Sequence, residues 1–130
     1  MTDTTICTTD AMADLYNSSK GVFDELFREV KELSRKKPDA TISKGKVSII
    51  NRVLSDLLIF LKDEPEGKYL DELDDDALPQ ISDAVLIMVQ FEAALEGFYR
   101  KYFRYALGER QWVTKELIEE SGPNYDEDEE

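Results

Sequence analysis

The chain has 130 residues, of which 42% are hydrophobic and 35% charged, and its formal net charge is −13. This length and this balance suit one folded domain with a hydrophobic core and exclude an intrinsically disordered chain. The sequence has no histidine and one cysteine, which excludes histidine-based metal sites, histidine-based acid–base catalysis and an internal disulfide framework.

The first predicted helix lies between Thr9 and Pro38. Thr9 or Asp10 suits the N-cap position, and the basic run 35–37 suits a helix C-terminus. Pro38 then ends the helix. The apolar residues of this segment fall in one arc at about 100° per residue, which is typical of an amphipathic helix. They are Met12, Leu15, Tyr16, Val22, Phe23, Leu26, Phe27, Val30 and Leu33.

The second predicted helix follows Ser43, a favourable N-cap residue, and stops before Pro65. Its main apolar positions alternate steps of three and four, the spacing of a packed helix face. These positions are Val47, Ile50, Leu54, Leu57 and Leu61, and the face is widened by Ile49, Val53 and Phe60.

The third predicted helix begins between Asp76 and Pro79 and ends at Gly108. Glu92 lies only about 40° from the centre of its apolar arc, which predicts a partly buried carboxylate. Glu92 is either a boundary residue or is paired with a polar side chain of a neighbouring helix, for which Asn51 of the second helix is one candidate. The arc is the longest in the chain and consists of Leu78, Ile81, Val85, Met88, Phe91, Leu95, Phe98 and Tyr102.

Residues 109–120 predict a short fourth helix that Gly122 and Pro123 close, and the acidic run at 123–130 predicts a disordered tail. Long helices joined by short links favour a bundle. The sequence therefore predicts an all-α fold, an antiparallel helical bundle of three long helices plus a short C-terminal helix. We expect residues 1–122 to form this single domain, with a loose N-terminus at 1–9.

Residues 71–83 contain six carboxylates, which raises the question of a metal site. A calcium loop of the EF-hand type needs glycine at position 6 and a glutamate at position 12. Counted from Asp71, these positions hold Asp76 and Ser82; counted from Asp74, position 6 is Pro79. Both registers fail, so we expect no metal and no cofactor, and we interpret the acidic residues as a helix start and its preceding loop.

The charge is concentrated in two acidic segments, 63–76 and 116–130, and the rest of the chain is nearly neutral. In an up-down-up bundle, the end of the first helix, the start of the second and the end of the third meet at one end. The sequence therefore predicts a basic pole, a candidate binding site for an anion, opposite the acidic 63–76 loop. Its residues are Arg35, Lys36, Lys37, Lys44, Lys46, Arg100, Lys101 and Arg104.

A second candidate surface is apolar. Leu86 and Val89 point away from the main face of the third helix, and Ala93 extends them into a strip. We expect either the fourth helix or a second copy of the chain to cover this strip. Trp112, on the predicted fourth helix, serves either to dock that helix on the bundle or as an exposed anchor for a partner.

These features favour a non-enzymatic helical protein, a protein–protein interaction or adaptor subunit that acts by binding other macromolecules and forms a possible homodimer. Two alternatives stay open: a nucleic-acid-associated subunit that uses the basic pole, and an acidic nucleic-acid mimic that inhibits a basic protein. The longest apolar runs, 57–61 and 84–89, are far shorter than the ~20 residues of a membrane span. The basic start of a secretion signal is also missing, so we expect a cytoplasmic protein without membrane contact.

Overall fold

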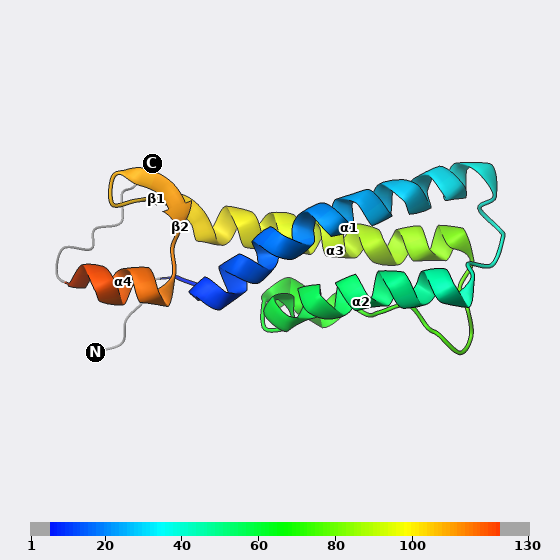
Figure 1. Cartoon of the computed structure of the whole chain (residues 1–130), viewed down its shortest axis with the longest axis horizontal. Helices are drawn as coiled ribbons and strands as arrows, with labels where there is room; N and C mark the ends of the chain where they lie inside the picture. Colours follow the sequence, from blue (N-terminus) through cyan, green and yellow to red (C-terminus); the bar gives the residue numbers. More distant parts are fainter. Residues whose placement is uncertain (1–5, 123–130) are drawn as a thin grey trace.

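The computed structural model describes residues 6–122 and is mostly helical, with one small two-stranded sheet (Figure 1). None of the helices in this part of the chain is long and apolar enough to cross a membrane. The elements in chain order are α1 (Asp10–Lys36), α2 (Lys44–Leu61), the 3-10 helix η1 (Pro65–Tyr69), α3 (Ile81–Tyr102), β1 (Phe103–Ala106), β2 (Glu109–Trp112) and α4 (Lys115–Ser121).

The first two helices begin at the predicted caps. The Thr9 hydroxyl accepts a hydrogen bond from the Met12 N–H at 3.2 Å, and the Ser43 hydroxyl accepts one from the Lys46 N–H at 3.2 Å. Each bond satisfies an amide that the first helical turn would otherwise leave without a partner. These local signals explain why the starts of α1 and α2 could be read from the sequence.

The direction of α3 differs from the prediction. The amide of Ile42 donates to the Pro79 carbonyl at 3.0 Å, and the amide of Ile81 donates to the Ala40 carbonyl at 2.9 Å. The start of α3 therefore lies beside the link between α1 and α2, and α3 runs parallel to α2 (Figure 1). The up-down-up arrangement is wrong because segment 62–80 returns along the bundle before α3 begins.

Segment 62–80 can make this return because it is long and carries its own apolar anchors. The 18-residue α2 is roughly 27 Å long, a distance that about eight or nine extended residues cover. Leu70 and Leu73 are buried, and Leu73 is bound through both its backbone groups to the Asn51 side chain, at 2.8 and 2.9 Å. Asn51 therefore holds this segment rather than Glu92, which is exposed.

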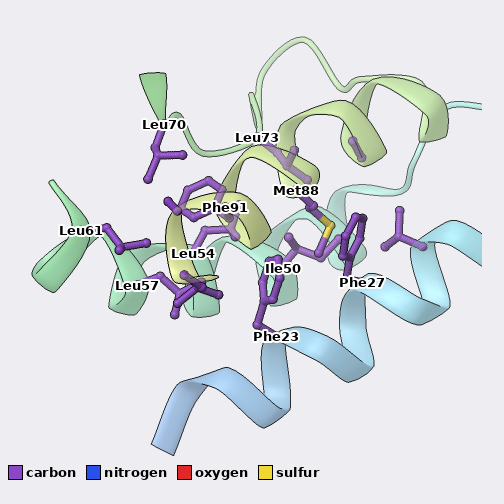
Figure 2. Close-up of a cluster of buried hydrophobic side chains, with 14 of the residues drawn as sticks. Phe23, Phe27, Ile50, Leu54, Leu57, Leu61, Leu70, Leu73, Met88 and Phe91 are labelled. Atoms are coloured by element: carbon purple, nitrogen blue, oxygen red, sulfur yellow. The ribbon is translucent and has the colours of Figure 1, made fainter. Parts of the chain in front are cut away.

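The core lies where the three long helices and the returning segment meet (Figure 2). Large apolar side chains from all four pieces fill it, which is the arrangement that removes most apolar area from water. Labelled in the figure are Phe23 and Phe27 from α1, Ile50, Leu54, Leu57 and Leu61 from α2, Leu70 and Leu73 from the segment, and Met88 and Phe91 from α3.

A β-hairpin replaces the end of the predicted third helix and the start of the predicted fourth. Strand β1 pairs antiparallel with β2, from Phe103 opposite Trp112 to Ala106 opposite Glu109. The two turn residues, Leu107 and Gly108, both have positive φ, 54° and 85°, as a tight hairpin turn requires. The all-α prediction is therefore corrected: the fold is broadly helical, and Gly108 serves as a turn residue instead of a helix stop.

The N-terminal segment is tied to the far end of the described chain. The Thr8 amide donates to the Val113 carbonyl at 3.1 Å, and the Lys115 amide donates to the Thr8 carbonyl at 2.7 Å. The Glu116 carboxylate accepts the Asp10 amide at 2.9 Å, and this bond lowers the pKa of Glu116. Residues 6–9 are thus held in place, whereas the rest of the predicted loose N-terminus and the predicted tail at 123–130 lie outside the described residues.

Candidate functional site

The residues of the predicted basic pole lie at opposite ends of the molecule. Figure 1 shows the link between α1 and α2 at one end and the hairpin at the other. The reversed direction of α3 therefore divides the set in two. Arg35, Lys36, Lys37, Lys44 and Lys46 lie at the link, whereas Arg100, Lys101 and Arg104 lie at the end of α3 and in β1.

At the hairpin end, Lys101 is engaged by an acidic neighbour. Its ammonium lies 3.0 Å from the Glu64 carboxylate, whose second oxygen accepts the Tyr102 hydroxyl at 2.8 Å. The hydrogen bond to Glu64 raises the pKa of Lys101. Burial, followed by the same carboxylate, raises the pKa of Tyr102 to about 12. This cluster joins α3 to the start of segment 62–80.

The other two cations of this group also have local partners. The Arg104 guanidinium donates to the carbonyls of Lys101 and Ile6, at 2.8 and 2.6 Å. Arg100 lies 3.6 Å from Glu96, one turn earlier on α3. Arg104 thus fastens the end of α3 to the N-terminal segment, a structural role that differs from binding an external anion.

At the link end, the basic residues are all exposed, and some of them lie near carboxylates. Lys44 and Arg52 share a polar depression with Glu72 and Asp75 of the returning segment. The acidic segment therefore does not form a pole opposite the basic residues. The link end therefore combines basic residues with carboxylates of the returning segment.

Within residues 6–122, Asp74, Asp75 and Asp76 form a cluster of exposed carboxylates whose oxygens lie within 4.8 Å of one another. The Asp74 carboxylate accepts the amides of Ala77 and Asp76, at 3.0 and 2.8 Å. These backbone bonds lower the pKa of Asp74. The Asp74 side chain therefore stabilises a turn at this cluster. The predicted start of the third helix between Asp76 and Pro79 is too early, because α3 begins at Ile81, after its N-cap Gln80.

The predicted apolar strip on α3 is on the surface. The Leu86 side chain is 62% exposed, and Val89 and Ala93 are exposed beside it. Helix α4 lies next to the hairpin and the start of α1, away from the middle of α3 (Figure 1). Within residues 6–122, the fourth helix therefore does not cover the strip.

Trp112 belongs to the interior of the hairpin end, where the sequence left open both a docking role and an exposed anchor for a partner. It lies on β2 and is partly buried. Its ring centroid lies 5.0 Å from that of Tyr16, 5.5 Å from that of Phe103 and 5.8 Å from that of Tyr99. These contacts dock the hairpin on α1 and α3, so Trp112 packs within the protein as a structural residue.

A further apolar surface was not predicted: a groove between α1 and α2. It contains a pocket of about 220 Å³ whose walls come from both helices. Ile49 is 49% exposed there, and Val22, one turn before Leu26, is 51% exposed. We define the α1/α2 groove by its pocket residues Leu26, Glu29, Val30, Leu33, Lys46, Ile49 and Ile50 and by Val22 and Val53, which continue it by one turn.

The sequence contained part of the signal for this groove. The predicted apolar faces of the first two helices include Leu26, Leu33, Ile49 and Val53. In the structure, Leu26, Leu33 and Val53 are only partly buried against the core, and Ile49 is 49% exposed. The apolar faces of the two helices are therefore wider than the surface that the core buries, and Val22 and Ile49 at their edge are exposed.

Comparisons with known proteins give no relative for this chain: no family model, no curated protein and no solved structure matches it.

Proposed function

We propose that the protein acts by binding an amphipathic helix of another protein in the α1/α2 groove. The observation that supports this proposal is the groove itself, an apolar depression that lies between α1 and α2. Its floor includes the buried residues Val30 and Ile50, so it is continuous with the core. Exposed apolar surface of this kind costs free energy in the unbound protein and marks protein-interaction sites.

The shape of the groove favours a helix as its occupant. Side chains along α1 and α2 recur at one-turn spacing, so they form ridges between which another helix packs. Val22, Leu26, Glu29 and Leu33 follow this spacing on α1, and Lys46, Ile49 and Val53 follow it on α2. Such a site selects apolar residues at positions i, i+3 or i+4, and i+7 of the bound helix.

Charges at the groove rim suggest the orientation of the partner. Lys46 lines the groove from α2 and Glu29 lines it from α1. Lys36, the last residue of α1, lies toward the link end. We expect the bound helix to place acidic side chains near the two lysines. The net charge of −13 does not prevent this contact, because charges act over roughly 8–10 Å at physiological salt.

Two isoleucines of α2 provide a matched test. Ile49 and Ile59 are equally exposed, at 49%, but only Ile49 lines the groove. A photo-crosslinking amino acid at position 49, in the native cell, should capture one partner protein through an amphipathic helical segment. Adding Val22→Asp should abolish this adduct.

The same crosslinker at position 59 is the control. The proposal fails if both positions give the same adducts, if position 49 gives none, or if the captured segment is not amphipathic. Capture of a second copy of this chain from position 49 would also contradict it, because the proposed occupant is a different protein.

The nucleic-acid alternative has less support than the sequence suggested. It requires basic residues gathered on one face. In the described chain they are divided between two ends, and Lys101 and Arg104 are engaged within the protein.

A further inference from the structure

The outer face of α3 carries a regular seam whose residues alternate steps of three and four. This spacing places the residues on one face of α3, the face that a second helix packed lengthwise against it would contact. From start to end, the α3 seam consists of Asp83, Leu86, Gln90, Ala93, Gly97 and Arg100.

The seam is open to solvent in the described chain. Asp83, Leu86, Gln90, Ala93 and Arg100 are exposed, and Gly97 is partly exposed. One neighbour borders it: a Glu66 carboxylate oxygen lies 3.2 Å from the point where a Cβ of Gly97 would sit. Glu66 is itself exposed, so its side chain has room to move aside.

The two halves of the seam are complementary to each other. The first half has a large side chain, Leu86, and an acidic one, Asp83. The second half has no side chain at Gly97 and a basic one at Arg100. In an antiparallel pair of α3 helices, each large residue faces a small one and each acid faces a base.

We propose that two copies of the chain associate through antiparallel α3 seams. The two-fold axis places Leu86 against Gly97 of the second copy, Gln90 against Ala93, and Asp83 against Arg100. Each contact occurs twice, as a two-fold interface requires. This surface is separate from the α1/α2 groove, so the inference does not depend on the proposed function.

Packing supports the antiparallel direction over the parallel one. Small residues at Ala93 and Gly97 let two backbones approach closely, and Leu86 of the second copy then fills the space over Gly97. Val89, at the edge of the seam, adds apolar area. A parallel pair would instead set Leu86 against Leu86 and leave Gly97 facing Gly97 across a void.

Charge supports the same direction. The antiparallel register forms two pairs between Asp83 and Arg100, whereas a parallel register would oppose like charges at both ends of the seam. Arg100 already lies 3.6 Å from Glu96, so Asp83 of the second copy would be its second acidic neighbour. One helix face buries less than the roughly 800 Å² per partner of a standard interface, which predicts a weak dimer.

Charge reversal tests the register. Asp83→Arg alone and Arg100→Asp alone each place like charges at both contacts, so each should weaken self-association by roughly tenfold in sedimentation equilibrium. The double variant restores opposite charges with the wild-type net charge. It should associate within about threefold of wild type, although both new charges oppose the helix dipole and lower helix stability.

Apolar controls complete the test. Leu86→Asp should abolish association, whereas Tyr69→Asp, at a residue of similar exposure (66%) outside the seam, should leave it unchanged. The proposal is overturned if wild type keeps a mass of 14.9 kDa up to millimolar concentration. It is equally overturned if the double variant stays as weak as the single ones, or if Ile49→Asp dissociates the dimer and Leu86→Asp does not.

Discussion

Replacing Asn51 by alanine should loosen the returning segment and with it the fold. The Asn51 side chain donates to the Leu73 carbonyl at 2.9 Å and accepts the Leu73 amide at 2.8 Å. A hydrogen bond contributes about 1 kcal/mol net, so losing both should cost about 2 kcal/mol of unfolding free energy. If the buried Leu73 side chain also detaches, exposure of a leucine adds roughly 1.5–3 kcal/mol.

Urea unfolding followed by circular dichroism measures this loss. Ser55→Ala is the matched control, because Ser55 is exposed on the same helix, one turn from Asn51 and on the rim of the same polar depression. We expect the control to stay within about 0.5 kcal/mol of wild type. If Asn51→Ala is as stable as the control, the two hydrogen bonds between Asn51 and Leu73 do not hold the returning segment. Our explanation for the direction of α3 is then refuted.

Three further predictions concern the hairpin end and the buried tyrosines. Leu107→Asn should stabilise the protein by about 0.5–1 kcal/mol, since asparagine tolerates the positive φ of 54° better than leucine; an unchanged urea midpoint would contradict this. Trp112→Ala should lower the free energy of unfolding by about 3–5 kcal/mol if the ring packs within the protein, whereas loss of an exposed side chain would leave it almost unchanged. Burial raises the pKa of Tyr16 and of Tyr102 to about 12 from 10.0, so the stability that each neutral tyrosine contributes is present below pH 10 and is lost as the pH rises to 12. This loss should amount to roughly 2–3 kcal/mol per tyrosine, and Tyr102→Phe should flatten the profile of urea midpoint against pH in that range.

Local features of the fold could be predicted from the sequence. Helix caps at Thr9 and Ser43 depend on hydrogen bonds that span three residues, and apolar periodicity depends on neighbours one turn away. The direction of α3 depends instead on Leu73, which bonds to a residue 22 positions away. Its apolar character was hidden among acidic neighbours, which made the segment look like a solvated loop.

The hairpin was missed for a different reason. Strands β1 and β2 have four residues each, too few for a period of two to be distinguished from a period of 3.6. Gly108 then fitted a helix stop as well as it fits a turn. The pairing of Phe103 with Trp112 distinguishes a hairpin turn from a helix stop at Gly108. That pairing joins residues nine positions apart, so no pattern of neighbouring residues shows it.

The candidate sites show the same difference between features that neighbouring residues determine and features that depend on contacts between distant parts of the chain. The helical period could show that Leu86 and Val89 point away from the main apolar face of the third helix, and both residues lie on the surface of α3. The prediction of a basic pole assumed that α3 runs antiparallel to α2. Because α3 runs parallel to α2, the two groups of basic residues lie at opposite ends, and the prediction is wrong. The α1/α2 groove required knowledge of which side of the first two helices stays uncovered.

Binding of a partner helix in the α1/α2 groove is tested most directly by titrating the segment captured from position 49, as a labelled peptide, into three proteins. These are wild type, Ile49→Asp and Ile59→Asp, whose two altered residues are equally exposed on α2. A charge placed in an apolar contact costs about 2–3 kcal/mol, so Ile49→Asp should weaken binding by roughly 30- to 150-fold, and Ile59→Asp should bind within about twofold of wild type. Equal affinity for all three proteins, or weaker binding by Ile59→Asp than by Ile49→Asp, would contradict the groove as the binding site.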